Sequence, residues 1–283
     1  MKYLILLLAV TLALTGCGAA GPGDGTPPPN QLPLESVAAP STPQSGGQAE
    51  RETATLTILP GATLPEIGVL LEEMGLFSAR SFMEAAESAD LGDFPLLADR
   101  PPNPDRFFPL EGYLFPGVYE IDPNHPPLAV IRQILENTEA QIDGELRRLI
   151  AESGHTVEEV FIIASIIQKE SLGNDQVKPL VSSVIHNRLN TGTMLQMCMT
   201  SFYVRDHIAP FYGGQAERFH DAYNTYIVPR LPAGPIGNPG LPAIRAALAP
   251  ADTDYFFYIW DADDNFHFAS QWEEHQANVQ KYL

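Results

Sequence analysis

The 283-residue chain is short of cysteine and of positive charge. It has 2 cysteines, and its 16 Lys and Arg face 35 Asp and Glu, which gives a formal net charge of −19. Two cysteines cannot build a disulfide scaffold or a cysteine-rich zinc site. The shortage of cationic side chains argues against a protein that binds nucleic acid, and against one held on anionic lipid by basic residues. With 45% hydrophobic residues, the chain has enough apolar material for one large domain or two small ones.

The chain also lacks a hydrophobic run of bilayer length at its amino terminus. The apolar stretch 3–14 is shorter than the ~20 residues of a membrane-spanning helix. It follows a single lysine, which is typical of a secretory signal. The motif Leu14-Thr-Gly-Cys17 resembles a bacterial lipobox, which implies a lipoprotein signal peptide over 1–16 and lipid modification of Cys17. The alternative is an ordinary signal peptide or short anchor that happens to contain Cys17.

Residues 17–53 are rich in Pro, Gly, Ser, Thr and Gln and have few large apolar side chains. Such a composition cannot bury enough surface to fold, so it predicts a flexible linker between the lipid anchor and a globular part. The protein is therefore expected at the bacterial cell membrane, tethered by lipid on the extracytoplasmic face.

A small module is predicted over 54–104. The alternation in 54–59 predicts a strand, Pro60-Gly61 a turn, and Thr63 with Glu66 a capped helix that ends near Gly75. A second helix is expected over 81–89. This order resembles the LysM-like module that binds glycan strands, so a module of ββ/αα type is expected. A plain packing subdomain is the other interpretation.

The remaining residues, 105–283, read as a larger, helix-rich catalytic domain. Helices are expected over 127–142, 145–151, 156–170, 177–190 and 271–282, the third of them started by a capping box of Thr156 and Glu159. The aromatic run 255–260 and residues 266–268, joined by a turn over 261–265, predict a C-terminal β-hairpin. The fold class is therefore α+β.

Glu170 stands out on the helix 156–170. Residues three, four and seven positions before it are Ile167, Ile166 and Ile163, which lie on the same helical face. A carboxyl that continues an apolar stripe is partly desolvated, which raises its pKa and suits a general acid near neutral pH. Alternatively, a glutamate in the last turn points to solvent or pairs with Lys169 or Lys178.

Several sequence blocks occur in an order that resembles a known family. The blocks are Phe108-Pro-Leu-Glu-Gly-Tyr-Leu-Phe-Pro116, Ile163-Ala-Ser-Ile-Ile-Gln-Lys-Glu-Ser171, Val184-Ile-His-Asn-Arg-Leu189, Tyr223-Asn-Thr-Tyr226, Leu231-Pro-Ala-Gly-Pro-Ile236, Asn238-Pro-Gly240 and Phe266-His-Phe268. Together they resemble the endolytic murein transglycosylases, the MltG or YceG-like family, over nearly all of 55–283. A lipobox here takes the place of the family's usual transmembrane anchor, and the region ahead of the catalytic domain is shorter.

The resemblance implies a lyase that cleaves the MurNAc–GlcNAc β-1,4 bond in nascent peptidoglycan strands and leaves a 1,6-anhydro-MurNAc end, which would terminate strand elongation. It implies glycan strands and cell-wall synthases as partners, and neither a metal nor a cofactor. The family's catalytic acid and base maps onto Glu170.

Other motif residues are expected to bind substrate. They are Glu111, Asn187, Arg188, Gln196, Thr200, Tyr223, Asn224 and Tyr226. For Glu111 the choice is between lining the cleft and buttressing a loop, and for the others structural hydrogen bonding is the alternative. Histidines 186, 220, 267 and 275 lack compact ligand spacing, so we expect structural roles and no metal site.

The chain departs from the family pattern after Gln196. Met197-Cys198-Met199 stands where the family has a small residue, Asp and Pro, and Cys198 is expected to be a small buried side chain and not a catalytic thiol. This change leaves two alternatives to the lyase: a non-catalytic peptidoglycan-binding or assembly lipoprotein with an impaired site, and a muramidase-type hydrolase.

Overall fold

The computed structural model describes residues 53–98 and 100–283. The signal peptide, Cys17 and the linker up to residue 52 lie outside them. No helix in this part of the chain has the length and apolar composition needed to cross a membrane.

In chain order the elements are β1 (Ala54–Ile58), α1 (Leu64–Glu73), α2 (Ala79–Ser88), α3 (Pro95–Ala98), β2 (Gly117–Ile121), α4 (Pro127–Gln141), α5 (Gly144–Ser153), α6 (Val157–Glu170), α7 (Lys178–Asn190), α8 (Cys198–Tyr203), the π-helical turn η1 (Val204–Ile208), α9 (Ala209–Tyr212), the 3-10 turn η2 (Gly213–Ala216), α10 (Glu217–Tyr223), α11 (Leu241–Leu248), β3 (Phe257–Trp260), β4 (Phe266–Ala269) and α12 (Trp272–Tyr282).

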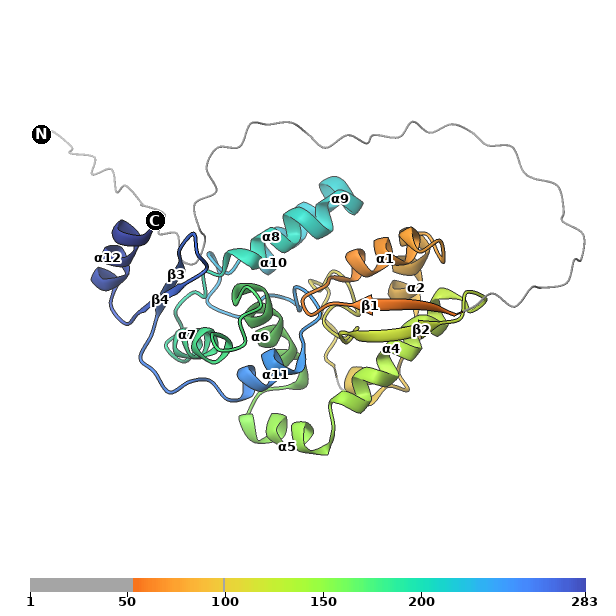
Figure 1. Ribbon diagram of the computed structural model, residues 1–283, viewed down its shortest axis with the longest axis horizontal. Coiled ribbons are helices and arrows are strands. Elements are labelled where there is room, and N and C mark those ends of the chain that lie inside the picture. The colour runs from red at the N-terminus through yellow and green to blue at the C-terminus, as the bar shows by residue number, and fades with distance from the viewer. Residues whose placement is uncertain (1–52, 99) are drawn as a thin grey trace, which may run out of the picture.

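The small module is built on an antiparallel pair of strands. β1 pairs with β2 so that Leu56 lies opposite Tyr119 and Ala54 opposite Ile121. On both strands every second side chain is buried, as the alternation in 54–59 predicts. Figure 1 shows α1 and α2 above this pair and α4 below it. The helices α1 and α2 also confirm the expected order of strand, helix and helix.

The second strand of the expected ββ/αα module lies beyond the segment 54–104. β2 begins directly after Pro116, within the segment assigned to the larger domain, so the first sheet crosses the proposed boundary between 104 and 105. The division of the chain at that point stays a prediction. The segment 54–104 is nevertheless incomplete by itself, because the backbone of β1 pairs with β2, which lies outside this segment.

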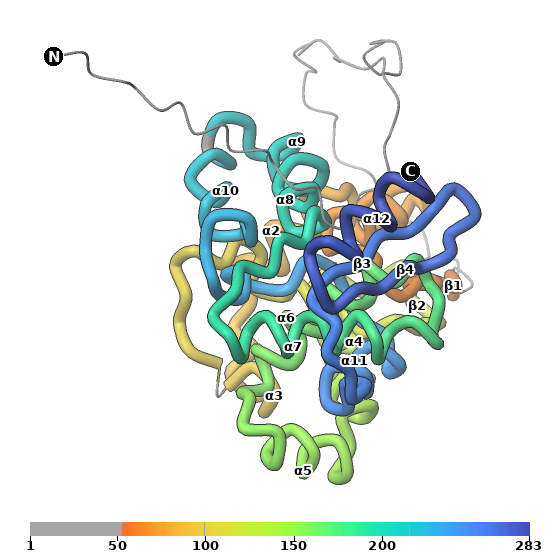
Figure 2. The backbone as a smooth tube through the Cα atoms, turned by 90° about the vertical axis from the view of Figure 1, so that its left-hand side faces the viewer, coloured from red at the N-terminus to blue at the C-terminus, as the bar shows by residue number. Residues whose placement is uncertain are grey.

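The larger domain is organised around α6. Thr156 caps this helix and Glu159 completes the capping box, as expected. Eleven of its 14 residues are buried, among them the isoleucine stripe. The helices α7, α8 and α11 pack against it. In the view of Figure 2, α6 and α7 lie near the centre of the molecule, with α5 below and α8 to α10 above. A helix that is apolar on most sides must be enclosed by its neighbours, which is what α6 requires.

Between residues 198 and 223 the chain forms a run of short helical segments, α8, η1, α9, η2 and α10, that the sequence analysis did not predict. α11 was not predicted either. Each of these segments has 8 residues or fewer, so none offers the repeated helical spacing on which such predictions depend. The predicted C-terminal hairpin, in contrast, is present as β3 and β4, and α12 follows it as expected.

The buried amide of Asn238 joins the two parts of the chain. Its Oδ1 accepts a hydrogen bond from the Leu114 amide at 2.8 Å, and its Nδ2 donates to the Ala62 carbonyl at 2.8 Å. Its backbone N–H also donates to Ala62, and its carbonyl accepts from Gly61 at 2.7 Å. The turn before α1 is therefore held against the body by one residue that is 0% exposed.

We expect Asn238→Ala to lower the free energy of unfolding by about 2–4 kcal/mol. The substitution leaves the buried Leu114 amide without an acceptor, which costs roughly 1–3 kcal/mol, and removes one of the two donors to the Ala62 carbonyl, which costs roughly 0.5–1.5 kcal/mol more. Urea denaturation measures the change. Asn190→Ala, at the exposed last residue of α7, is the matched control and should stay within about 0.5 kcal/mol of wild type. Equal effects of the two changes would contradict the role given to Asn238.

Candidate active site

The carboxyl of Glu170 lies at the end of α6 and is completely buried, with 0% of the residue exposed. Oε2 accepts a hydrogen bond from the Tyr258 hydroxyl at 2.8 Å. Oε1 accepts one from the backbone N–H of Met199 at 3.3 Å. The apolar stripe therefore does carry Glu170 inward, so the alternative of solvent exposure is wrong. Among the described residues Glu170 forms no ion pair with Lys169 or Lys178, so the alternative of pairing is wrong as well. Lys178 pairs with Asp175 instead.

The three groups come from distant parts of the chain. After α6, Leu172 and Gly173 take positive φ values of 50° and 78° and turn the chain away, which leaves Glu170 as the last helical residue. Met199 lies near the start of α8 and Tyr258 on β3, 88 residues after Glu170. Tyr258 was not among the site residues expected from the sequence. The aromatic run 255–260 predicts a hairpin, but nothing in the local pattern says which ring meets the carboxyl.

Burial raises the pKa of Glu170 to about 7, against the opposing effect of the hydrogen bonds from Tyr258 and Met199. Burial and the adjacent Glu170 carboxyl also raise the pKa of Tyr258, so its hydroxyl keeps its proton and remains a donor. A carboxyl with this pKa is protonated in an appreciable fraction of molecules near neutral pH, which general acid catalysis requires.

A network of hydrogen bonds fixes the segment that covers Glu170. The Met197 amide donates to the Thr225 hydroxyl at 2.9 Å, and the Gln196 amide donates to the Thr225 carbonyl at 3.0 Å. The Thr200 hydroxyl, 0% exposed, donates to the Met197 carbonyl at 2.7 Å. Thr200 is thus engaged inside the segment, and Thr225, which the sequence analysis did not single out, is the residue that joins it to the next turn.

Arg188 is the largest fully buried side chain among the described residues, and it binds backbone carbonyls. Its Nε donates to Phe256 at 2.7 Å, and its Nη1 donates to Met194, Leu195 and the Gln196 side chain at 2.9–3.1 Å. Arg188 therefore ties β3 and the Met194–Gln196 segment to α7. Asn187 acts similarly, since its amide donates to the carbonyls of Thr253 and Tyr255, both at 2.9 Å. These contacts favour the structural alternative for both residues.

The turn that contains the remaining predicted ligands lies beside this network. The Tyr223 hydroxyl is buried and accepts a hydrogen bond from the Phe107 amide at 3.3 Å. The Asn224 side chain accepts one from the Tyr226 amide at 3.0 Å. Tyr226 is close enough to Tyr258 and Arg188 to influence the pKa of each. Of the predicted substrate ligands, Gln196, Asn224 and Tyr226 are half-buried, and their contact with substrate stays a prediction.

Glu111 is a second buried carboxyl, 1% exposed, and it buttresses the small module. It accepts hydrogen bonds from the Leu64 amide at 3.1 Å and from the Tyr203 hydroxyl at 2.9 Å. Leu64 is the first residue of α1, where helical amides lack partners within the helix. Burial raises the pKa of Glu111 to about 7, although these hydrogen bonds and the charge of Lys169 lower it. Its geometry favours the buttressing role over lining a cleft.

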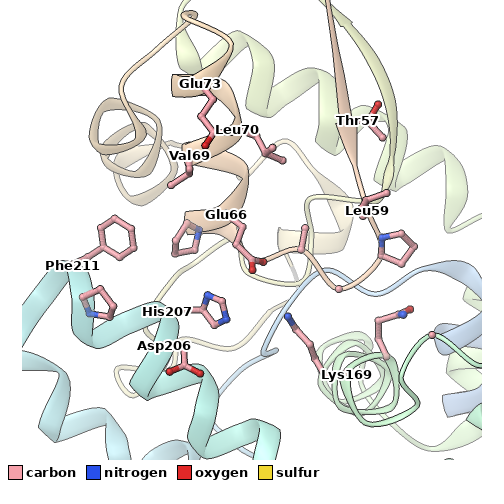
Figure 3. A pocket seen from close by; sticks show the side chains of 17 residues that line it. Thr57, Leu59, Glu66, Val69, Leu70, Glu73, Lys169, Asp206, His207 and Phe211 are labelled. Atoms are coloured by element: carbon pink, nitrogen blue, oxygen red, sulfur yellow. The ribbon is translucent and has the colours of Figure 1, made fainter. Parts of the chain in front are cut away.

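An open cleft of about 1020 Å³ lies where the small module meets the body (Figure 3). Leu59, Val69, Leu70 and Phe211 give it apolar walls, and Glu66, Lys169, Asp206 and His207 add charged and polar groups. The Thr63 hydroxyl, at the start of α1, is 3.3 Å from His207 Nδ1 on η1, so the two sides of the junction touch there.

Glu170 does not line this cleft. A smaller cavity of about 220 Å³ shares Lys169, Asp206 and His207 with it and extends to Met199, whose amide binds the Glu170 carboxyl. Met199 therefore borders the smaller cavity and also binds the buried acid.

A model of the YceG-like family matches residues 38–281 of this chain. The chain belongs to the YceG-like family. The family expected from the ordered sequence blocks is thereby confirmed. The architecture agrees, because a crystal structure of a YceG-like protein from Listeria monocytogenes superposes with a TM-score of 0.69 at 24% sequence identity, covering 79% of this chain and 75% of that one. The α+β fold class is confirmed as well.

Two relatives of this YceG-like chain are described as endolytic murein transglycosylases. The protein of Streptococcus pneumoniae D39 is 27% identical over 264 residues, which cover 85% of this chain and 47% of the relative. The protein of Bacillus subtilis 168 is 25% identical over 236 residues, which cover 81% of this chain and 65% of the relative. The chain thus spans only part of the length of the relatives it matches.

The four histidines of this YceG-like chain that were considered as metal ligands are engaged separately. His186 Nε2 contacts the Ala247 carbonyl at 3.0 Å, and His267 Nε2 contacts Asp261 at 2.9 Å. His220 lies beside Asp221, and His275 is buried against Phe257. Within residues 53–98 and 100–283, no three His, Cys, Asp or Glu side chains are grouped as a metal site would need. Cys198 is buried at the first position of α8.

Two buried carboxyls with raised pKa values, Glu111 and Glu170, make the stability of this YceG-like protein dependent on pH. Glu111 and Glu170 have pKa values of about 7 in the folded chain against an ordinary 4.5, so the folded state holds these protons to higher pH than the unfolded state. The free energy of unfolding should therefore fall as pH rises from about 4.5 to about 7, by roughly 3 kcal/mol for each carboxyl, and then level off.

Urea denaturation at pH 5, 6, 7 and 8 measures this dependence. The double variant Glu111→Gln with Glu170→Gln should have a flatter dependence than wild type. Glu136→Gln, on the exposed side of α4, should keep the wild-type slope. A double variant with an unchanged slope would show that the two carboxyls are not the source.

Proposed function

We propose that this chain is an endolytic murein lytic transglycosylase that cleaves MurNAc–GlcNAc β-1,4 bonds in nascent strands and leaves 1,6-anhydro-MurNAc ends. The observation that carries the proposal is the buried Glu170 carboxyl, with a pKa of about 7, held between the Tyr258 hydroxyl and the Met199 amide. The relatives that are described as endolytic murein transglycosylases support it, as does membership of the YceG-like family.

One carboxyl suffices for this reaction. Protonated Glu170 gives its proton to the glycosidic oxygen as the bond from C1 breaks, which releases the GlcNAc end. The resulting carboxylate then takes the proton of the 6-hydroxyl of the same MurNAc, and O6 bonds to C1. Glu170 is protonated again at the end and no water is consumed. The Tyr258 hydroxyl and the Met199 amide stabilise the intermediate carboxylate, since both donate hydrogen bonds to it.

The surroundings of Glu170 favour this route over two-carboxylate hydrolysis. A conventional glycosidase needs a second carboxylate as a nucleophile or to activate water. Among the described residues, no other carboxylate forms a hydrogen bond with Glu170 or contributes to its pKa shift. Two further glutamates are buried and engaged elsewhere: Glu111 accepts hydrogen bonds from the Leu64 amide and Tyr203, and Glu158 accepts one from Arg106.

Substrate must displace part of the cover of Glu170, because the residue is 0% exposed. We place the glycan strand in the cleft of Figure 3, with access past Met199, which is half-buried and borders the smaller cavity. In this proposal Gln196, Asn224 and Tyr226 bind sugar hydroxyl groups or ring faces, and the module of 54–104 helps to bind the strand.

The cellular setting belongs to the same proposal. Cleavage after residue 16 and lipidation of Cys17 would hold the protein on the extracytoplasmic face of the membrane, where residues 17–53 separate it from the bilayer. There it would act beside the synthases that extend the strands and terminate their elongation.

Glu170→Gln should abolish product release while the protein stays folded. The glutamine oxygen can accept from the Met199 amide and its NH2 group can donate to the Tyr258 hydroxyl oxygen, but the side chain has no acidic proton to transfer. Mass spectrometry of products from uncrosslinked glycan strands is the measurement, with at least a 10³-fold loss expected for the removal of an essential acid. Glu136→Gln is the exposed control and should retain wild-type activity.

The products distinguish the alternatives. Reducing-end MurNAc in place of anhydro ends would identify a muramidase. Strand binding without product from wild-type protein would identify a non-catalytic binding lipoprotein.

Tyr258→Phe should move the alkaline limb of the pH–rate profile upward by about one pH unit. The Tyr258 hydrogen bond lowers the pKa of Glu170, so its loss raises that pKa and keeps the acid form to higher pH. The maximal rate should fall roughly tenfold, because the intermediate carboxylate loses a donor. Tyr255→Phe, on the loop before β3, is the matched control. A limb that stays in place in Tyr258→Phe would contradict the assignment of this limb to Glu170.

A further inference from the structure

The hairpin of β3 and β4 has two unlike faces. Its register pairs Tyr258 with Phe268 and Trp260 with Phe266, so these four aromatic side chains project from the same face. We call this set, Tyr258, Trp260, Phe266 and Phe268, the aromatic face. The opposite face carries Phe257, Ile259, His267 and Ala269.

The opposite face is covered by α12. Phe257 lies against Trp272 and His275, with ring centroids 5.6 and 5.2 Å apart. His267 stacks on Tyr282 at 3.5 Å. Figure 1 shows α12 on the outer side of the hairpin, away from α6 and α7. The aromatic face is therefore the one turned toward the body and Glu170.

The rings of the aromatic face form a continuous series. Tyr258 and Trp260 have centroids 6.4 Å apart, Trp260 and Phe266 5.9 Å, and Phe266 and Phe268 6.0 Å, with planes tilted by 20–39°. At the inner end Tyr258 is 2% exposed and binds the Glu170 carboxyl. At the outer end Trp260 and Phe266 are only half-buried.

The outer pair thus extends the apolar surface from the buried acid toward solvent. Two residues along a strand advance about 7 Å, so Trp260 lies one step beyond the ring that touches Glu170. A pyranose ring has an apolar face of C–H groups, and large aromatic rings suit such a face because they offer broad contact with little side-chain freedom to lose.

We propose that Trp260 and Phe266 form a stacking platform for the sugar ring next to the bond that Glu170 cleaves. This inference rests on the proposed function, since it takes the ligand to be a β-1,4-linked amino-sugar strand. Tyr258 then has two neighbours, the acid on one side and the platform on the other, and the platform sets which glycosidic oxygen comes within reach of Glu170.

A purely structural interpretation makes a different forecast. Cross-strand aromatic pairs also stabilise hairpins, and in that case replacing Trp260 would alter stability without altering the affinity for sugar. Binding must therefore be measured separately from folding and from catalysis.

The chain offers a matched pair for this test, because its 2 tryptophans, Trp260 and Trp272, lie on opposite faces of the hairpin. In the full chain carrying Glu170→Gln, Trp272→Phe leaves Trp260 as the single fluorescent reporter, and Trp260→Phe leaves Trp272. Titration with soluble uncrosslinked glycan strands should change the emission of the first protein and leave that of the second nearly constant.

Affinity gives the second readout. Trp260→Ala and the milder Trp260→Leu should weaken strand binding by about 3- to 10-fold, the effect of one lost aromatic contact. Trp272→Phe should not change it. In the protein with Glu170 intact, Trp260→Leu should raise KM by a similar factor with a smaller effect on kcat.

Unchanged affinity in folded Trp260→Leu, together with unchanged Trp260 emission on binding, would overturn the platform. The two proposals fail separately. Anhydro products with strand affinity that does not depend on Trp260 would retain the lyase and reject the platform. Loss of affinity in Trp260→Leu from a wild-type protein that releases no product would retain the platform and reject the lyase.

Discussion

The Tyr258 hydroxyl and the Met199 amide both donate hydrogen bonds to the carboxyl of Glu170, which is buried away from water. Burial without partners would leave a polar group at a high energetic cost, and too many donors would bring its pKa back to that of an ordinary carboxylate. Two donors leave the pKa of Glu170 near 7. The fold must therefore bring three segments far apart in the chain to the end of one helix.

The residues around the site are arranged to hold those segments in register. Arg188 binds the carbonyls that precede Met197 and the one at Phe256, so a single guanidinium fixes both the cover of Glu170 and the strand of Tyr258. Thr225 fixes the other end of the cover. Two other buried residues hold the small module in place. Glu111 binds the first amide of α1, and Asn238 binds the turn before that helix. Polar groups inside this chain mostly position backbone, and few are left to meet a ligand.

The sequence predicts those features that depend on near neighbours. The capping box of Thr156 and Glu159 and the isoleucine stripe predict α6 and the burial of Glu170, because both patterns lie within one helix. Alternation predicts β1, and the aromatic run with its turn predicts β3 and β4, for the same reason. The pairing of β1 with β2 joins residues up to 67 apart, and the contact of Tyr258 with Glu170 joins residues 88 apart, so no local pattern contains them. Arg188 was expected among the substrate ligands because of its place in a motif. A motif does not indicate whether such a residue binds sugar or the protein backbone.

The register of the first sheet also determines how the protein responds to force. Ala54, where the chain enters the sheet, lies opposite Ile121, where β2 leaves it for α4 and the body. A pull that arrives along the chain from residue 53 therefore acts at one end of the ladder and opens its five residue pairs in turn, like a zipper, instead of shearing them together. The ladder of β1 and β2 is consequently loaded in the weaker of its two pulling geometries. Tension from the amino-terminal side would peel away β1 and leave α6 and its carboxyl undisturbed.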